Sequence, residues 1–458
     1  MTHTEVEKDV YVSGFAAFEQ SAAVRNQPWL RPLRTAAISR FAELGFPDTR
    51  NERWRHTNVA PIAKVPFTLA TRQAGGLKPA DLAPYVFGEP DWAQLVFVNG
   101  YFSDELSSLA SLPRGVRVKS MAAALESDRR LIEPYLGRGA ALDHDPFAAL
   151  NTAFMADGVF IHIAPAIVLK QPLHVLFLST GRREPTVSHP RNLIVVGNGS
   201  QAAIIESYVA LDRCLYLTNG LTEVFLGNDA KVDFYKLQRE SEDAFHIDTL
   251  NVTQERDSAF SSHSISIGGA IVRNNIDVRL DGQGADCILN GLYVTKGRQH
   301  VDNHTTVDHA RSNCGSRELY KGILDDRSTG VFHGRIVVRK DAQKTNAKQS
   351  NRNLLLSRDA LVNTKPELEI FADDVKCTHG ATIGQLDEEA LFYLRSRGLD
   401  QDSARVLLTY AFANDLLASM KIKPMQCQLD LVLLTRLSRG HGGPIDVGRA
   451  PAGIEGVL

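Results

Sequence analysis

The chain has 458 residues, with 51 Lys plus Arg and 53 Asp plus Glu, so its formal net charge is −2. This balance argues against a dedicated nucleic-acid-binding protein, which usually carries a basic excess on one face. The hydrophobic content of 43% argues against a disordered chain. The length allows either about three domains of roughly 150 residues or one long domain.

Cysteine usage and the N-terminal residues bear on the compartment. The five cysteines stand far apart, and no C-x-x-C pair occurs among them: Cys214, Cys287, Cys314, Cys377 and Cys427. Such spacing predicts reduced thiols rather than a disulfide framework or a four-cysteine zinc site. The first nine residues lack the apolar run of a signal peptide, and no stretch approaches the roughly 18 apolar residues of a membrane span. We therefore expect a cytoplasmic protein without a membrane role.

Residues 1–155 are predicted to form a helical and mixed N-terminal region. Apolar residues recur every three or four positions over residues 5–44, which indicates helix. Residues 51–58, NERWRHTN, are expected to form a docking loop in which Trp54 is buried and the two arginines are solvated. Residues 94–98 have the pattern of a strand, and residues 120–127 that of a short helix.

Residues 156–383 are predicted to form a β-rich core. Short β-prone runs are separated by Gly, Asn, Asp and Ser, at 167–169, 174–178, 193–196, 203–208, 221–226 and 232–237. A turn of two polar residues and one small residue recurs, and its small residues are Ser200, Ala230, Ser258, Ala285 and Ala342. The steps between these positions are 30, 28, 27 and 57, so the last is about twice the others. This period predicts a stacked β-solenoid, and the alternative is a sandwich whose turns are spaced by chance.

Residues 384–440 return to helical patterns, at 386–397, 401–420 and 425–437. Asp400 is the expected N-cap of the second helix. An apolar stripe on that helix consists of Val406, Leu407, Tyr410, Ala411 and Leu417. The stripe predicts packing on a neighbouring helix, docking of a partner, or both on different faces. Residues 441–458 are rich in Gly and Pro and are expected to be a flexible tail.

Two motifs invite functional readings that their context does not favour. Residues 193–202 carry a strand followed by G-x-G-x-x-A, the dinucleotide-binding fingerprint, but the next residues are β-prone where the fingerprint needs a helix. No G-x-x-x-x-G-K-[ST] occurs, so ATP hydrolysis through a P-loop is not expected.

The histidines at 300, 304, 309 and 333 are expected to be solvated. On a strand, His300 and His304 would lie about 13 Å apart, too far for one metal.

Cys377-Thr-His379-Gly380 is the most informative short motif. In an extended strand, residues two apart share one face at about 6.5 Å. A thiolate and an imidazole so placed can share a metal or an iron–sulfur cluster, because soft iron accepts both donors. The alternative is a buried cysteine beside a hydrogen-bonded histidine.

Several longer segments resemble the SufB/SufD family of iron–sulfur cluster assembly proteins. They are residues 344–356 (KTNAKQSNRNLLL), 364–370 (TKPELEI) and 373–382 (DDVKCTHGAT). Residues 51–58 are similar to the family's E-x-W-R-x-T-N segment, and residues 391–398 to its C-terminal helix. Gly380 directly after His379 resembles the SufD branch, because the SufB branch usually has a glutamate there. A SufB-like sister subunit remains the alternative within the family.

The resemblance implies a right-handed parallel β-helix flanked by N-terminal and C-terminal helical regions. It also implies a non-catalytic scaffold subunit. Such a subunit pairs with a SufB-like subunit through β-helix edges and binds a SufC-like ATPase through its C-terminal helices. The complex builds a nascent iron–sulfur cluster, shared transiently with the partner, and passes it to apo-proteins. His379 is then the expected iron ligand or entry point at the subunit interface, and Cys377 a weaker candidate. A homodimer is possible when the chain is isolated, and no nucleic acid is expected.

Two other classes of function are kept as alternatives. A carbohydrate-active β-helix lyase or hydrolase needs paired carboxylates on one face, but Asp373 and Asp374 are adjacent and point to opposite faces if extended. A nucleotide-dependent oxidoreductase would rest on the glycine motif at residues 197–202 alone.

Overall fold

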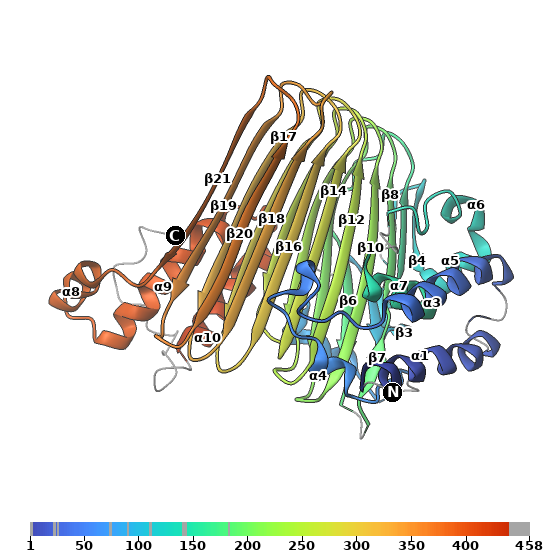
Figure 1. Cartoon of the computed structure of the whole chain (residues 1–458), viewed down its shortest axis with the longest axis horizontal. Coiled ribbons are helices and arrows are strands. Elements are labelled where there is room, and N and C mark those ends of the chain that lie inside the picture. The colour runs from blue at the N-terminus through green and yellow to red at the C-terminus, as the bar shows by residue number, and fades with distance from the viewer. Residues whose placement is uncertain are drawn as a thin grey trace.

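The computed structural model describes residues 3–438 except 22–23, 25–26, 73–75, 89–90, 110–111, 140–143 and 182–183; of residues 3–10 it describes the backbone only. The predicted flexible tail, residues 441–458, lies outside the described residues. The described chain forms a β-solenoid, and each full turn adds one strand to each of two sheets. Figure 1 shows the stacked strands in the centre, the N-terminal helices beside one end and the C-terminal helices beside the other.

The first sheet, called sheet A here, has its strands in the order β20-β18-β16-β14-β12-β10-β8-β5-β4, with β1 and β7 at its side. Their bounds are β1 Thr68–Leu69, β4 Val116–Ser120, β5 Val159–Ile163, β7 Thr186–Ser188, β8 Arg191–Val196, β10 Tyr216–Leu226, β12 Phe245–Gln254, β14 Ile271–Leu280, β16 His300–His309, β18 Thr329–Val338 and β20 Leu361–Ile370.

The second sheet, sheet B, runs β21-β19-β17-β15-β13-β11-β9-β6-β2-β3. Their bounds are β2 Ala93–Val98, β3 Tyr101–Ser108, β6 Leu173–Ser179, β9 Gln201–Ala210, β11 Lys231–Arg239, β13 Ala259–Ser266, β15 Asp286–Thr295, β17 Gly315–Leu324, β19 Asn346–Leu355 and β21 Lys376–Gly384.

Helices flank the solenoid on both sides in sequence. The α-helices are α1 His3–Gln20, α3 Arg31–Leu44, α4 Ala60–Ala63, α5 Met121–Ser127, α6 Arg129–Ile132, α7 Pro146–Phe154, α8 Glu388–Ser396, α9 Gln401–Ala418 and α10 Lys423–Ser438. Three short 3₁₀-helices are η1 Pro28–Leu30, η2 Glu52–Trp54 and η3 Pro79–Tyr85. As predicted, Asp400 caps α9, and its carboxylate accepts a hydrogen bond from the Ser403 amide.

The fold prediction is confirmed in its main features, and the predicted repeat has a structural cause. At one corner of each turn a residue with positive φ is followed by a buried residue, which stands directly before the next strand of sheet B. The positive-φ residues are Gly199, Asp229, Asp257, Gly284, Asn313 and Lys344. Small polar residues and glycine tolerate this backbone conformation best, which explains the polar character of the repeated turn.

One assignment within the repeat is corrected. The strand register pairs Gly315 with Asn346, so the buried corner residue after Ala285 is Cys314 and the next one is Thr345 rather than Ala342. The corner at residues 339–345 is three residues longer than predicted, because its positive φ falls on Lys344. Ala342 is also buried, which is why its small side chain resembled the repeat signal.

Other expectations need smaller changes. The run 167–169 forms only an isolated bridge between Val168 and Gln201 instead of a strand. The helical pattern over residues 5–44 is divided between α1 and α3. The predicted boundary at 155/156 precedes β5 by three residues, but β2, β3 and β4 of the N-terminal region already belong to the two sheets. The N-terminal region is therefore joined to the solenoid by strand pairing.

The two ends of the solenoid differ in how they are finished. At the closed end, β4 pairs antiparallel with β5 and β3 pairs antiparallel with β2. Aromatic side chains of α1, α3 and α7 gather there in one buried cluster. At the open end, β20 and β21 each have a partner strand on one side only, within the described chain. Figure 1 shows β21 as the outermost strand on that side.

Candidate functional site

Cys377 and His379 lie on β21, the last strand of sheet B, at the open end of the solenoid. The register pairs Cys377 with Ala347 and His379 with Gln349 of β19. Ala347 and Gln349 are buried and point to the interior of the solenoid. Because paired residues in a parallel sheet share a face, Cys377 and His379 also lie on the interior-facing side of their strand. They are accessible because the next turn, which would cover them, is missing.

The two candidate ligands differ in exposure. His379 is exposed, whereas Cys377 is half-buried beside the apolar cluster that contains Ile336, Val338 and Ala347. Burial raises the pKa of the Cys377 thiol, so its resting form is the neutral thiol. A metal or a nearby cation would have to stabilise the thiolate before Cys377 could act as a ligand.

A polar column continues from His379 into the solenoid. In consecutive turns of sheet B, the register places Glu318, Gln349 and His379 at equivalent positions. The Gln349 side-chain amide donates a 2.7 Å hydrogen bond to Glu318, and both residues are buried. Burial raises the pKa of Glu318 to about 7, because desolvation disfavours the carboxylate. Beneath the open end, the interior is therefore polar at this level of the strands.

Among the described residues, no group of three or more His, Cys, Asp or Glu side chains gathers to hold a metal ion. Cys377 and His379 form a pair of donors of the right chemistry for iron, on adjacent positions of one strand face. A pair leaves half of a tetrahedral coordination shell to other ligands.

The C-terminal helices cover the outer face of sheet B. The apolar side chains of α9 and α10, including Leu416 and Leu429, form one buried cluster with Ile205, Leu237 and Leu292 of the sheet. Figure 1 shows α8 extending away from the solenoid beyond α9.

The predicted stripe on α9 divides between two environments. Val406 and Leu417 are buried, so these two side chains serve packing on the solenoid and are not available as a docking surface. Leu407 and Ala411 are exposed, while Tyr410 is half-buried and donates a 3.0 Å hydrogen bond to Asp430. The outward part of the stripe is therefore Leu407, Tyr410 and Ala411.

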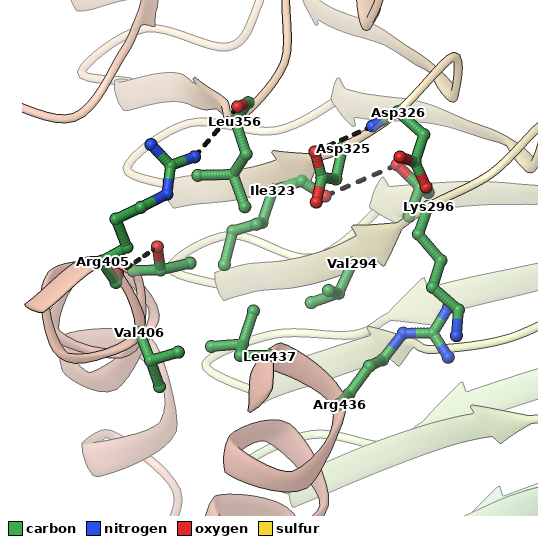
Figure 2. A pocket seen from close by; sticks show the side chains of 12 residues that line it. Val294, Lys296, Ile323, Asp325, Asp326, Leu356, Arg405, Val406, Arg436 and Leu437 are labelled. Atoms are coloured by element: carbon green, nitrogen blue, oxygen red, sulfur yellow. Dashed lines mark hydrogen bonds between the residues drawn. The ribbon is translucent and has the colours of Figure 1, made fainter. Parts of the chain in front are cut away.

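A cavity of about 160 Å³ separates the helices from the edge of the solenoid. Figure 2 shows Arg405 and Val406 of α9 and Arg436 and Leu437 of α10 facing Val294 and Ile323 of the strands. The Arg405 guanidinium donates a 3.1 Å hydrogen bond to the Leu356 carbonyl oxygen, which links α9 directly to the chain after β19. The helices and the solenoid therefore contact each other through apolar side chains, and polar side chains line the partly open edge of this contact.

The sequence did not single out two exposed aromatic residues on α8. Phe392 is 73% exposed and Tyr393 is 56% exposed. The sequence does contain a signal for them, because Phe392 and Tyr393 are adjacent aromatic residues. A helix that packs with one face cannot bury two adjacent side chains completely.

The histidine prediction is wrong for two residues. His304 and His309 are buried instead of solvated. Loop 51–58 lies over this part of sheet A, and Thr57 of the loop bonds His300 at 2.8 Å. The His304 imidazole bonds Asp302 at 3.0 Å, and burial lowers its pKa to about 4. His309 is instead buried inside the solenoid, in register with Leu280 and Val338, and its imidazole bonds the Ser316 hydroxyl at 2.9 Å. Sequence alone could not show that a distant segment would cover His304.

Loop 51–58 behaves as predicted for its tryptophan. Trp54 is buried, and the guanidinium of Arg273 stacks 3.8 Å from its ring centre.

The glycine motif at residues 197–202 leads from β8 into β9, with no helix following. The dinucleotide-binding reading therefore loses the structural context that it needs.

Within the part of the chain that the structure describes, no helix is long and apolar enough to cross a membrane.

The chain matches two family models. The core-domain model of SufBD proteins of the SUF system for FeS cluster assembly matches residues 177–412. The model of the SufBD N-terminal region matches residues 5–175.

Three relatives match over most of their length. An iron–sulfur cluster assembly SufBD family protein of Synechocystis is 35% identical over 404 residues, covering 86% of this chain and 88% of the relative. The iron–sulfur cluster assembly protein SufD of Escherichia coli is 29% identical, covering 88% and 92%. SufD of Bacillus subtilis is 24% identical, covering 92% and 96%. Two of the three relatives are named SufD, in agreement with the branch indicated by Gly380. The chain belongs to the SufBD family of iron–sulfur cluster assembly proteins of the SUF system.

Proposed function

We propose that this chain is a non-catalytic subunit of a scaffold complex in which a nascent iron–sulfur cluster is assembled and then delivered to apo-proteins. The cluster is cargo of the complex and is held only transiently. The observation that carries the proposal is the position of Cys377 and His379 on the interior-facing side of an uncovered edge strand. A partner strand added to that edge would bring its own side chains next to both donors.

The open end is the proposed contact for a SufB-like subunit. An uncovered strand presents unpaired backbone donors and acceptors, which favour pairing with another chain. Apolar side chains exposed beside the two last strands add to this surface: Leu361, Ile370, Phe371 and Ile383. In the isolated chain the same surface could pair with a second copy, which is the expected homodimer.

The outward side of the C-terminal helices is the proposed contact for a SufC-like ATPase. Leu407, Tyr410 and Ala411 on α9 are joined there by Phe392 and Tyr393 on α8. Aromatic side chains are enriched where protein interfaces gain most of their binding energy. ATP hydrolysis is assigned to this partner, since the sequence has no P-loop.

The test is co-expression with SufB-like and SufC-like partners, anaerobic size-exclusion chromatography, and iron and sulfide analysis. We expect one complex that contains iron and sulfide, and a large loss of both in a His379→Ala variant whose complex still assembles. Thr378→Ala is the matched control, because Thr378 is exposed on the same strand and points to the opposite face. Normal cluster content in the His379→Ala complex would contradict the role of His379.

A chain that elutes alone from all partners would contradict the scaffold proposal itself. Equal losses in the His379→Ala and Thr378→Ala variants would assign the effect to the strand rather than to a ligand.

A further inference from the structure

A pocket of about 380 Å³ lies where loop 51–58 crosses the outer face of sheet A. It opens next to β16, β18 and β20, and its lining reaches Ile383 of β21, which lies on the same strand face as Cys377 and His379. Its charged and titratable lining residues come from the loop and from the strands: Glu52, Arg53, Arg55, His56, His304, His333 and Lys365. Its apolar lining includes Val331, Val362 and Ile383. Volumes of a few hundred Å³ are typical of sites for small ligands.

The loop that forms one wall of the pocket is held firmly on the sheet. Buried Arg273 donates a 2.8 Å hydrogen bond to the Arg53 carbonyl oxygen and a 2.7 Å hydrogen bond to the carboxylate of buried Asp302. The Thr57 hydroxyl donates a 2.5 Å hydrogen bond to the same carboxylate. With Trp54 stacked on Arg273, these contacts fix the backbone that carries Arg53 and Arg55.

Most side chains around the pocket already have partners. Glu52 pairs with Lys365 at 3.2 Å, and Glu367, outside the pocket lining, pairs with Lys365 at 3.1 Å and with His333 at 2.9 Å. The acidic groups near the rim are thus engaged by the lysine and one histidine. His304 is engaged by Asp302, as described above.

The arginine side chains of the loop are the exception. Within the described residues, the guanidinium groups of Arg53 and Arg55 form no hydrogen bond or ion pair, and neither does the imidazole of His56. Asp277 lies within electrostatic reach of Arg53 without forming an ion pair with it. Two guanidinium forks therefore remain available on a fixed loop at the wall of a cavity.

We propose that this pocket binds a small organic anion with several oxyanion oxygens, of the phosphate or polycarboxylate type. Guanidinium groups bind both kinds of oxygen through paired, charge-assisted hydrogen bonds. The volume exceeds what a single phosphate fills, and the apolar lining suits the carbon skeleton of a small metabolite. Metal binding is disfavoured, because no group of metal-holding side chains gathers here in the described chain.

The test is isothermal titration calorimetry of the full chain with citrate and, separately, with inorganic phosphate at low ionic strength. The double variant Arg53→Gln/Arg55→Gln should raise the Kd of the bound anion at least about tenfold, the effect of losing one good charge-assisted hydrogen bond. Its fold should persist, since the Arg53 contact with Arg273 uses the backbone carbonyl. Circular dichroism and the thermal midpoint check this.

Arg50→Gln is the matched control. Arg50 lies just outside the loop, is 91% exposed and is already paired with Asp48. The proposal expects unchanged binding in this variant. Absence of saturable binding of both probes, or equal weakening by Arg50→Gln, would overturn it. Tighter binding of citrate would identify a polycarboxylate, and tighter binding of phosphate a phosphate ester; neither result depends on cluster assembly or on partner chains.

Discussion

The two ends of the solenoid are built from the same ladder of parallel strands but are finished in opposite ways. At the closed end, antiparallel strands and the N-terminal helices cover the last turn. At the open end, β20 and β21 keep one edge free within the described chain, and Phe371 and Ile383 are more than half exposed. The comparison teaches that the stacked repeat forms the core throughout the solenoid. Whether an end is covered decides which of its side chains stabilise the fold and which stay exposed for contact with a partner.

The largest expected effect is a difference in the free energy of unfolding between variants of two ion pairs, one near each end of the solenoid. Arg191 and Glu223 form a 2.5 Å pair that is fully buried near the closed end, whereas Arg335 and Glu369 form a 2.7 Å pair that is partly exposed near the open end. Arg191→Met should lower the free energy of unfolding by about 3–5 kcal/mol, because it leaves a buried carboxylate unpaired. Arg335→Met should cost only about 0–1 kcal/mol. Urea unfolding of both variants measures the difference, and similar losses would contradict the comparison.

The next effect is a pair of opposite pH dependences. Burial lowers the pKa of His189, near the closed end, from 6.5 to about 3, so the unfolded chain binds more protons and stability falls as pH drops through this range. Burial raises the pKa of Glu318, below the open end, from 4.5 to about 7, so the folded chain binds more protons and stability falls as pH rises through that range. Unfolding in urea across pH 4 to 7 should show that His189→Phe reduces the acid loss and Glu318→Gln the loss toward neutrality. Unchanged slopes in both variants would show that other groups control the pH dependence.

An intermediate effect concerns association at the open edge. Ile383 is 51% exposed on β21, and Val168 is 55% exposed beside sheet B far from that edge. Ile383→Asp should weaken pairing with a SufB-like partner at least about tenfold, since a charge would be placed in an apolar contact. Val168→Asp should leave pairing unchanged, and both variants should keep their stability within about 0.5 kcal/mol. Analytical ultracentrifugation tests this, and equal binding by both variants would place the interface elsewhere.

The smallest effect is a difference in thiol reactivity between two cysteines that occupy equivalent strand positions in different turns of sheet B. The register places Cys287 three turns below Cys377, through Ser316 and Ala347. Both face the interior, but only Cys377 is accessible at the uncovered end. Native iodoacetamide labelling followed by mass spectrometry should modify Cys377 slowly, because its thiol pKa is raised, and Cys287 only after unfolding. Rapid labelling of Cys287 would mean that the solenoid opens readily.

The repeat was predictable because each turn needs the same backbone conformation at its corner. A corner residue with positive φ favours Gly, Asn or Asp, which occupy five of the six corners named above, Lys344 being the sixth. The residue after it is small, so the pattern appears directly in the sequence. The one misplaced corner, at Ala342 instead of Thr345, shows the limit of this signal. This corner, residues 339–345, is longer than the preceding one, residues 310–314, and it contains a second small buried residue, Ala342, three positions before the true corner residue.

The site was predictable in its residues but not in its setting. The spacing of Cys377 and His379 placed both on one strand face, and the structure agrees. Their accessibility depends on the absence of a covering turn, which no local pattern encodes. The division of the α9 stripe into buried Val406 and Leu417 and outward Leu407 depends on where sheet B lies.

The sequence by itself therefore determined the solenoid, its flanking helices, the family and the pair of candidate iron ligands, because all of these rest on local periodicity and short motifs. The tertiary structure alone decided which histidines loop 51–58 would bury, that Arg53 and Arg55 would remain at the wall of a pocket, and which edge would stay uncovered. The physical reason is that burial depends on segments far apart in the chain: Thr57 meets Asp302 across 245 positions, and no local pattern records such a contact.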